Sequence, residues 1–408
     1  MSQPKYDKRA LVPRLRFPEF RDAGEWETKS LAKLASRSTS KNIEGSYTRV
    51  LTNSAEFGVV DQRDYFEKDI ATQGNLEGYY IVEKGDYVYN PRISARAPVG
   101  PISKNNVATG VMSPLYTVFR FNGLNNDFYA HYFNSTHWHH YMRQASSTGA
   151  RHDRMSITND DFMCLPLPVA SPEEEQKIAD FLSSIDDQIT AETQMLATLK
   201  THKSGLMQQF FPREGETIPR LRFPEFRDAG EWGEKLLGAI CDMQAGKFVA
   251  ASEISEMQAE GLYPCFGGNG LRGYTKMFNQ SGRYSLVGRQ GALCGNVNLV
   301  EGNFYATEHA VVASPKPGIS TDWLFCNLCF LNLNRFATGQ AQPGLSVEVL
   351  EKVNCAVPKD EKEQQKIADC LSSLDELITA QSLKIETLKR HKNGLMQQIF
   401  PVLEEIQT

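Results

Sequence analysis

The chain has 408 residues, of which 41% are hydrophobic and 23% charged, and its formal net charge is −5. This composition fits an ordinary globular protein, and the length allows two or three domains. No stretch approaches the ~18 apolar residues of a membrane span and no apolar run opens the chain, so we expect neither a membrane helix nor a signal peptide. The eight cysteines are scattered, which predicts reduced thiols in the cytoplasm.

Two stretches of the chain occur twice. The segment "PRLRFPEFRDAGEW" covers 13–26 and again 219–232, and the text of 175–212 is repeated with changes at 364–401. The chain is therefore two copies of one plan, with different text between constant ends. We expect a leading segment at 1–26 and 218–232, a variable domain at 27–170 and 233–359, and a conserved helix at 171–217 and 360–408.

The first variable region predicts a compact α/β domain. Segments 78–91 and 113–121 predict strands, and 125–146 predicts helices.

A long helix follows, with apolar residues at a spacing of four and three. Ser171 and Pro172 predict its start, and Pro212 predicts its end. Apolar residues that follow this spacing over such a length form a stripe, or seam, that predicts a coiled coil. We expect this helix to pair with the repeated helix at 360–408 of the same chain, in an antiparallel arrangement. The seam positions are Ile178, Leu182, Ile185, Ile189, Glu192, Leu196, Leu199, Lys203, Leu206 and Phe210, matched by Ile367, Leu371, Leu374, Ile378, Gln381, Ile385, Leu388, Lys392, Leu395 and Ile399.

The second variable region predicts the same order of elements, with strands within 283–314 and helices within 320–339. Thr148, Gly149 and Pro168 recur at an offset of 190 as Thr338, Gly339 and Pro358, but the residues between these anchors differ. We therefore expect two versions of one fold, each presenting different polar side chains on the same loop.

Arginine and amide side chains gather on corresponding loops of both regions. Arginine pairs with guanine and Asn or Gln with adenine in the DNA major groove, although any single residue could be an ordinary surface side chain. The regions hold 15 basic against 14 acidic residues and 10 against 10, so their charge permits DNA binding. We predict DNA contacts from Asn90, Arg92, Arg96, Arg143, Arg151, His152 and Arg154, and from Asn269, Arg272, Tyr274, Arg289, Gln290, Gln340 and Gln342.

The two repeated helices carry the acidic excess, with nine acids against four bases in 171–217 and nine against six in 360–408. We predict that their outer faces bind partner proteins, although acids that only keep the chain soluble are the alternative. The candidate partner-binding residues are Glu173, Asp186, Asp187, Asp375 and Glu376.

Two motifs point weakly to other chemistry. Gly268, Gly270 and Gly273 form G-x-G-x-x-G, but the strand-like "YTKMF" follows where a dinucleotide site needs a helix, so close backbone approach to a partner is the better account. Cys326 and Cys329 form C-x-x-C without a second ligand pair, so we expect core residues and no metal site. The chain has neither a Walker A loop nor the Asn-Pro-Pro-aromatic motif of amino-methyltransferases, so we expect no catalysis by it.

The motifs "SPEEEQKIADFLSSIDDQI" at 171–189 and "DEKEQQKIADCLSSLDELI" at 360–378 each end a divergent α/β region. Together with "GDYVYNPRISARAPVG", "VMSPLYTVF" and "VGRQGALCGNV", this duplication resembles the specificity subunit of type I restriction-modification enzymes over essentially the whole chain.

The resemblance implies that each variable region reads one half of a split, asymmetric double-stranded DNA target. It implies that an antiparallel coiled coil spaces the readers and docks two modification (methyltransferase) subunits, and that ATP-dependent restriction subunits then join. The chain would be non-catalytic, with S-adenosylmethionine and ATP bound by its partners. Two other classes stay open: a self-contained DNA methyltransferase, and a coiled-coil scaffold that binds proteins only.

Overall fold

The structure is a computed structural model that describes residues 11–65, 76–123, 126–146, 153–291, 293–339 and 343–402. The chain divides into two compact units, Met1–Ala191 with Ile385–Thr408, and Glu192–Lys384. Each unit holds one variable region, one copy of the repeated 14-residue segment and a part of each long helix. Among the described residues, no helix has the length and apolarity that crossing a bilayer requires.

The first unit is built on a four-stranded antiparallel sheet in the order β2-β9-β6-β7. Its strands are β2 (Ala35–Arg37), β9 (Thr117–Phe121), β6 (Tyr87–Tyr89) and β7 (Ile102–Lys104). Three further antiparallel pairs are β1 (Glu27–Ser30) with β10 (Pro166–Val169), β3 (Leu51–Ser54) with β4 (Gly58–Asp61), and β5 (Tyr80–Val82) with β8 (Gly110–Met112). The short helices are η1 (Pro18–Phe20), α1 (Leu31–Leu34), α2 (Gln62–Tyr65), α3 (Asp127–Phe133), α4 (His139–Ala145) and α5 (Asn159–Met163).

Alternation along the strands gives this sheet two apolar faces. Tyr87 and Phe119 pack on one face with the aromatic residues of α3, and this core continues to Ile178 of the first long helix. Val88 and Val118 point the other way into a smaller cluster. Because successive strand residues face opposite sides, both sides of the sheet are covered.

The second unit has a six-stranded sheet in the order β12-β17-β15-β16-β13-β14. Its strands are β12 (Cys241–Ala245), β17 (Ala310–Pro315), β15 (Gln280–Gly288), β16 (Val297–Ala306), β13 (Tyr263–Gly267) and β14 (Gly270–Thr275), and β11 (Gly233–Leu236) pairs separately with β18 (Asn354–Val357). The helices are η3 (Pro224–Phe226), α7 (Leu237–Ile240), η4 (Ala251–Glu253), α8 (Thr321–Phe330), η5 (Leu333–Phe336) and α9 (Val347–Glu351).

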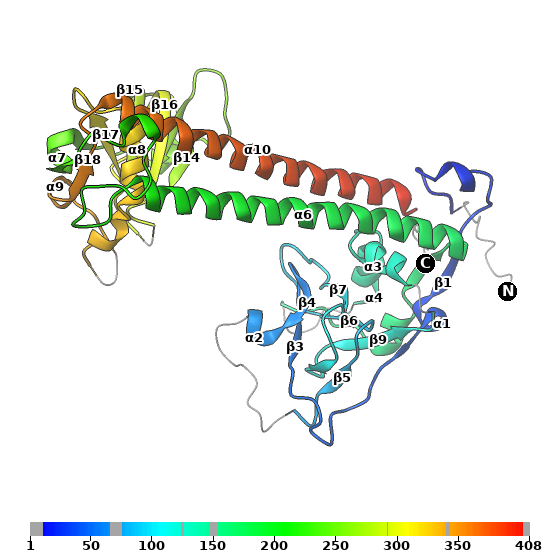
Figure 1. The fold of residues 1–408 in the computed structure, drawn as a ribbon. Coiled ribbons are helices and arrows are strands. Elements are labelled where there is room, and N and C mark those ends of the chain that lie inside the picture. The colour runs from blue at the N-terminus through cyan, green and yellow to red at the C-terminus, as the bar shows by residue number, and fades with distance from the viewer. Residues whose placement is uncertain are drawn as a thin grey trace, which may run out of the picture. The chain divides into compact units, whose positions relative to one another are not determined.

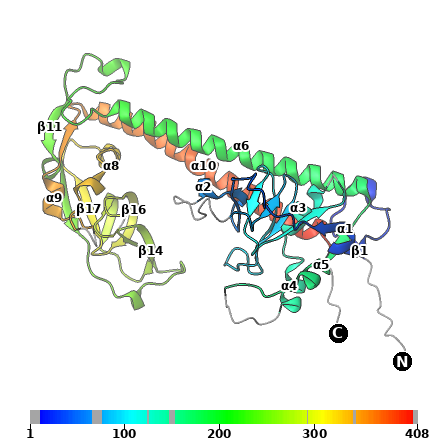
Figure 2. The ribbon, with the colours of Figure 1, turned by 90° about the horizontal axis from the view of Figure 1, so that it is seen from below.

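Helix α8 lies against this sheet (Figure 2), where Trp323 and Leu324 pack with Val287 and Val311. The strand order β12-β17-β15-β16 repeats β2-β9-β6-β7 of the first unit, and β13 with β14 extends it. Strands and helices occur where the sequence predicts them, although β15 begins at Gln280 and β17 ends at Pro315, just outside the predicted 283–314. The expectation of two versions of one fold is confirmed. The buried Cys326 belongs to this core, as predicted.

The two long helices are α6 (Pro172–Phe210) and α10 (Glu361–Ile399), and in each unit they lie side by side (Figure 1). Every predicted seam position is buried or half-buried. In the second unit, Gln381 Nε2 donates to Glu192 Oε2 at 2.6 Å, and Lys203 Nζ contacts Asp375 Oδ1 at 2.6 Å. Since the partner number falls from 381 to 375 as the α6 number rises from 192 to 203, the helices run antiparallel, as predicted.

The repeated 14-residue segment holds the start of each long helix. Arg16 donates from Nε and Nη2 to the two oxygens of Glu174, both at 2.7 Å, and Trp26 Nε1 donates to the same carboxylate at 3.1 Å. The Glu174 side chain is 1% exposed, so this carboxylate is satisfied inside the protein. Arg16 Nη1 also donates to Gly24 O at 2.8 Å, which closes the segment on itself.

The second copy repeats these contacts with Arg222, Glu363 and Trp232. Each segment also touches the end of the helix from the other repeat: Leu15 N donates to Gln398 O, and Leu221 N donates to Gln209 O. The recurrence of fourteen residues therefore has a structural reason, because both copies join the start of one long helix to the end of the other.

Candidate nucleic-acid interface

The structure joins two stretches of the first region that were predicted separately. Arg92 and Arg154 are partners in an isolated antiparallel bridge, supported by Ile93 N donating to Asp153 O at 3.0 Å and Met155 N to Pro91 O at 2.9 Å. Arg92 is exposed and Arg154 is half-buried beside Asp153. Two guanidinium groups thus rise from neighbouring backbone positions, as a contact surface for an anionic partner requires.

The side chain of Asn90, a predicted DNA contact, is engaged within the protein. Its Nδ2 donates to Asn53 O at 2.9 Å and its Oδ1 accepts from Arg92 N at 3.0 Å, so the amide holds the loop. Arg96 is exposed but forms an ion pair with Glu56. An exposed pair of this kind is weak, so Arg96 stays available for other contacts.

Arg143 lies on α4 and is exposed, and it remains a prediction. Arg151, His152, Gln340 and Gln342 lie outside the described residues, so their predicted roles stay untested.

In the second unit, three predicted residues line one hollow of about 540 Å³: Asn269, Arg272 and Gln290. Asn269 sits in the turn between the paired residues Gly267 and Gly270 of β13 and β14. Gln290 follows β15, and its backbone forms a bridge with Gly344, which also lines the hollow. Three separate connections of the sheet therefore meet at this hollow, which Leu271 and Pro343 also line.

His309 also lines the hollow and is a fourth polar side chain there, which was not predicted from the sequence. It lies in the turn between β16 and β17, and its Nε2 is 3.1 Å from Glu308 Oε1. A polar "TEH" between two apolar strands is the signal that could have found it.

Tyr274 and Arg289, two further predicted residues, do not line the hollow. Tyr274 is half-buried and exchanges backbone hydrogen bonds with Ser255 at 2.8 Å. Arg289 donates from Nε to Leu345 O at 3.3 Å, and its backbone N donates to His309 O at 2.9 Å. Arg289 therefore fixes the backbone around the hollow, and the DNA contact predicted for it stays a prediction.

The G-x-G-x-x-G stretch is the turn and first strand residues of an antiparallel hairpin, so no helix opens there and it is not a dinucleotide loop. A Cβ at Gly268 would lie 2.8 Å from His309 O, and one at Gly273 would lie 2.5 Å from Ser255 O. The glycines thus permit close approach to the protein's own backbone, which corrects the expectation of an external partner. Among the described residues, no three His, Cys, Asp or Glu side chains gather to hold a metal.

On the long helices, Glu173, Asp187 and Glu376 are exposed, as an outer acidic face requires. The side chains of Asp186 and Asp375 are 46% and 41% exposed, and each also pairs with a seam lysine of the opposite helix: Asp186 with Lys392, and Asp375 with Lys203 at 2.6 Å. Their predicted role in partner binding stays a prediction. The sequence places Lys203 and Lys392 at equivalent positions, and each finds the aspartate of the opposite helix.

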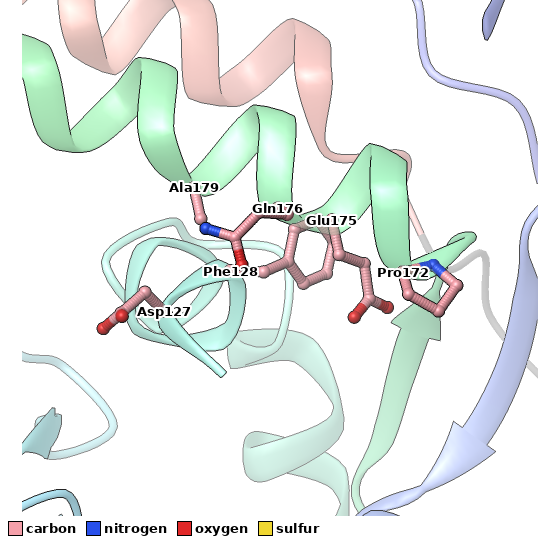
Figure 3. A pocket seen from close by; sticks show the side chains of 6 residues that line it. All are labelled: Asp127, Phe128, Pro172, Glu175, Gln176 and Ala179. Atoms are coloured by element: carbon pink, nitrogen blue, oxygen red, sulfur yellow. The ribbon is translucent and has the colours of Figure 1, made fainter. Parts of the chain in front are cut away.

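A hollow of about 70 Å³ lies below the start of α6 in the first unit (Figure 3), between Glu175 and Phe128 of α3. This volume holds about two water molecules and is too small for a nucleobase. Glu175 Oε1 accepts from Ala170 N at 3.1 Å and Tyr129 OH at 3.4 Å. Burial raises the pKa of Glu175 to about 7. At the equivalent position of the second unit, Gln364 donates from Nε2 to Gly318 O at 3.1 Å.

Comparisons with known proteins match this architecture. The family model for the type I restriction modification DNA specificity domain matches residues 26–201 and 229–390. The chain belongs to this family and contains two copies of its domain.

A specificity subunit of the type I restriction enzyme EcoprrI from Escherichia coli is 50% identical over 151 residues, 37% of each chain. The MjaVIII specificity subunit from Methanocaldococcus jannaschii is 23% identical over 282 residues, 62% of this chain and 64% of the relative. The matches thus span 37% and 64% of these two curated relatives.

Two solved structures share the fold. The S subunit of a type I restriction-modification system from M. genitalium has a TM-score of 0.62 at 14% identity, covering 97% of this chain and 100% of that one. A chain from a study of complex assembly and conformational transition of the type I system has a TM-score of 0.53 at 16% identity, covering 92% and 97%.

Proposed function

We propose that this chain is the DNA-reading subunit of a type I restriction-modification complex, in which each variable region reads one half of a bipartite, asymmetric target. The observation that supports this best is the doubled plan: two sheets with the same strand order carry different polar side chains at their loops. Two readers of one shape with different contact residues suit a target with two different halves.

We further propose that the long helices dock two modification subunits, which restriction subunits then join. The exposed acids Glu173, Asp187 and Glu376 supply a charged face for such partners. In this proposal the chain itself performs no catalysis, and S-adenosylmethionine and ATP bind to the partner subunits. The relatives' names as specificity subunits support this division of roles.

Methylome sequencing of host cells with and without the gene tests the proposal. We expect one split motif whose methylation disappears with the gene, and copurification of this chain with a methyltransferase. Methylation by the purified chain alone would favour a self-contained methyltransferase. An unchanged methylome, with the chain still bound to proteins, would favour a scaffold.

A further inference from the structure

The hollow of the second unit differs from the surface of the first in the chemistry of its free side chains. Asn269, Arg272 and Gln290 are exposed, and their side chains make no hydrogen bond to the part of the chain that the structure describes. Among the described candidate residues of the first unit, by contrast, Asn90 is engaged by the backbone, and the exposed residues are Arg92, Arg96 and Arg143. The second surface therefore offers two unengaged amides beside one guanidinium group.

This set suits base edges better than phosphates. A phosphate oxygen only accepts hydrogen bonds, so it would use the amino group of each amide and leave the carbonyl oxygen idle. In the major groove, adenine presents a donor and an acceptor side by side, which one Asn or Gln side chain can pair together. Guanine presents two acceptors, which suit the two donors of an arginine.

The walls of the hollow allow a base edge to come close. Gly267 and Gly270 at the hairpin and Gly291 and Gly344 also line the hollow and carry no side chains. Within this glycine frame the side chains of Asn269, Arg272, Gln290 and His309 are the polar groups that remain to make contacts.

The frame is also held in place. Arg289 ties the turn at His309 to the segment at Leu345, since its backbone N donates to His309 O and its side chain donates to Leu345 O. Leu345 N donates back to Arg289 O at 2.9 Å. A contact surface with a fixed backbone loses less conformational entropy on binding, which favours specific recognition.

We propose that this hollow reads a purine pair in the half-site of region 233–359, an adenine through the amide of Asn269 or Gln290 and a neighbouring guanine through Arg272. Arg289 is a positioning residue for this surface. The inference rests on the proposed function and adds to it the class of base that the second reader selects.

The test uses the complex of this chain with its methyltransferase subunits and DNA duplexes carrying the motif found by methylome sequencing. Each adenine of one half-site is replaced in turn by 7-deazaadenine, which lacks the N7 acceptor, and each guanine by 7-deazaguanine. We expect one 7-deazaadenine to weaken binding by about two- to tenfold, because it removes one of the two hydrogen bonds of a bidentate contact. One of the variants Asn269→Ala and Gln290→Ala should lose that contact. For this variant, replacing the same adenine by 7-deazaadenine should not weaken DNA binding further.

Arg272→Ala should lose sensitivity to 7-deazaguanine in the same way. The matched control is Asn303→Ala, an exposed amide on β16 that does not line the hollow, which should leave all affinities unchanged. A half-site without an A·T pair would overturn the inference. So would variants that weaken binding to every sequence equally and lower its salt dependence, because that pattern marks phosphate contacts. If the wild-type complex binds the motif no better than scrambled DNA, the proposed function itself fails.

Discussion

Replacing Glu175 with Gln should stabilise the first unit at neutral and alkaline pH. The folded pKa of Glu175 is raised to about 7 by burial, whereas the unfolded chain releases this proton near 4.5. Between these values the folded protein holds a proton that the unfolded chain has lost. The free energy of unfolding therefore falls as pH rises through this window and is lowest above pH 7.

The size of the effect follows from the pKa shift. A shift from 4.5 to about 7 corresponds to at most about 3 kcal/mol, at 1.36 kcal/mol per unit. Because Glu175 is only half-buried, solvent screening reduces this, and we expect about 1–2 kcal/mol. The substitution keeps an oxygen that accepts from Ala170 N and Tyr129 OH, so the local hydrogen bonds survive.

Hydrogen exchange measured by mass spectrometry between pH 6 and 8, after correction for the intrinsic exchange rate, separates the two units. Peptides from the start of α6 should gain protection in Glu175→Gln, and the gain should grow with pH. The second repeat supplies the matched control, Gln364→Glu. Its amide donates to Gly318 O and Pro358 O, which a carboxylate cannot do, so protection at the start of α10 should fall. Equal protection of wild type and Glu175→Gln at every pH would refute this account of the pKa.

Three further predictions concern the long helices. Asp186→Lys or Lys392→Asp alone should destabilise the first unit by about 1–3 kcal/mol, because Lys392 is only 9% exposed, and the double exchange should recover part of this loss in urea unfolding. Asp187→Lys with Glu376→Lys should weaken association with the methyltransferase subunits on size-exclusion chromatography without changing the circular dichroism spectrum, and unchanged association would remove the acidic-face proposal. Four residues inserted beside Glu192 and four beside Gln381, which face each other, add about 6 Å to each helix and should lengthen the gap of the methylated motif by one or two base pairs of roughly 3.4 Å. A functional variant that keeps the original gap would show that these helices do not set the distance.

The periodic spacing of apolar residues predicted the two long helices of the fold. The seam of α6 and α10 follows from the regular spacing of apolar residues, because burial imposes that spacing locally. The partners of polar groups do not leave such a trace. Asn90 bonds to Asn53, 37 residues away, and Asp186 pairs with Lys392, 206 residues away. An amide or carboxylate that is satisfied inside the protein looks the same in a sequence as one that is free to bind.

For the same reason, the hollow of the second unit was only partly predictable. The amides Asn269 and Gln290 were identified by residue type, but their convergence depends on a sheet that brings residues 267–272 beside 309 and 343–344. Tyr274 and Arg289 have side chains suited to base contacts and lie next in sequence to residues near the hollow. In the structure, however, the backbone of Tyr274 bonds to Ser255 and the side chain of Arg289 donates to Leu345 O.

The first unit combines residues 1–191 with residues 385–408, so its core cannot be completed until the second segment has been synthesised. Its core includes Met396, Ile399 and Phe400, and the Phe400 ring lies 5.3 Å from Phe128 and 5.4 Å from Tyr132. The second unit, Glu192–Lys384, is continuous in sequence. A ribosome adding about 5–20 residues per second needs about 10–40 s to pass from Ala191, where the first segment of this unit ends, to Ile385, where its second segment begins. The region made first is therefore the last to be completed, and during that interval Phe128 and Tyr132 lack the ring contacts that Phe400 supplies.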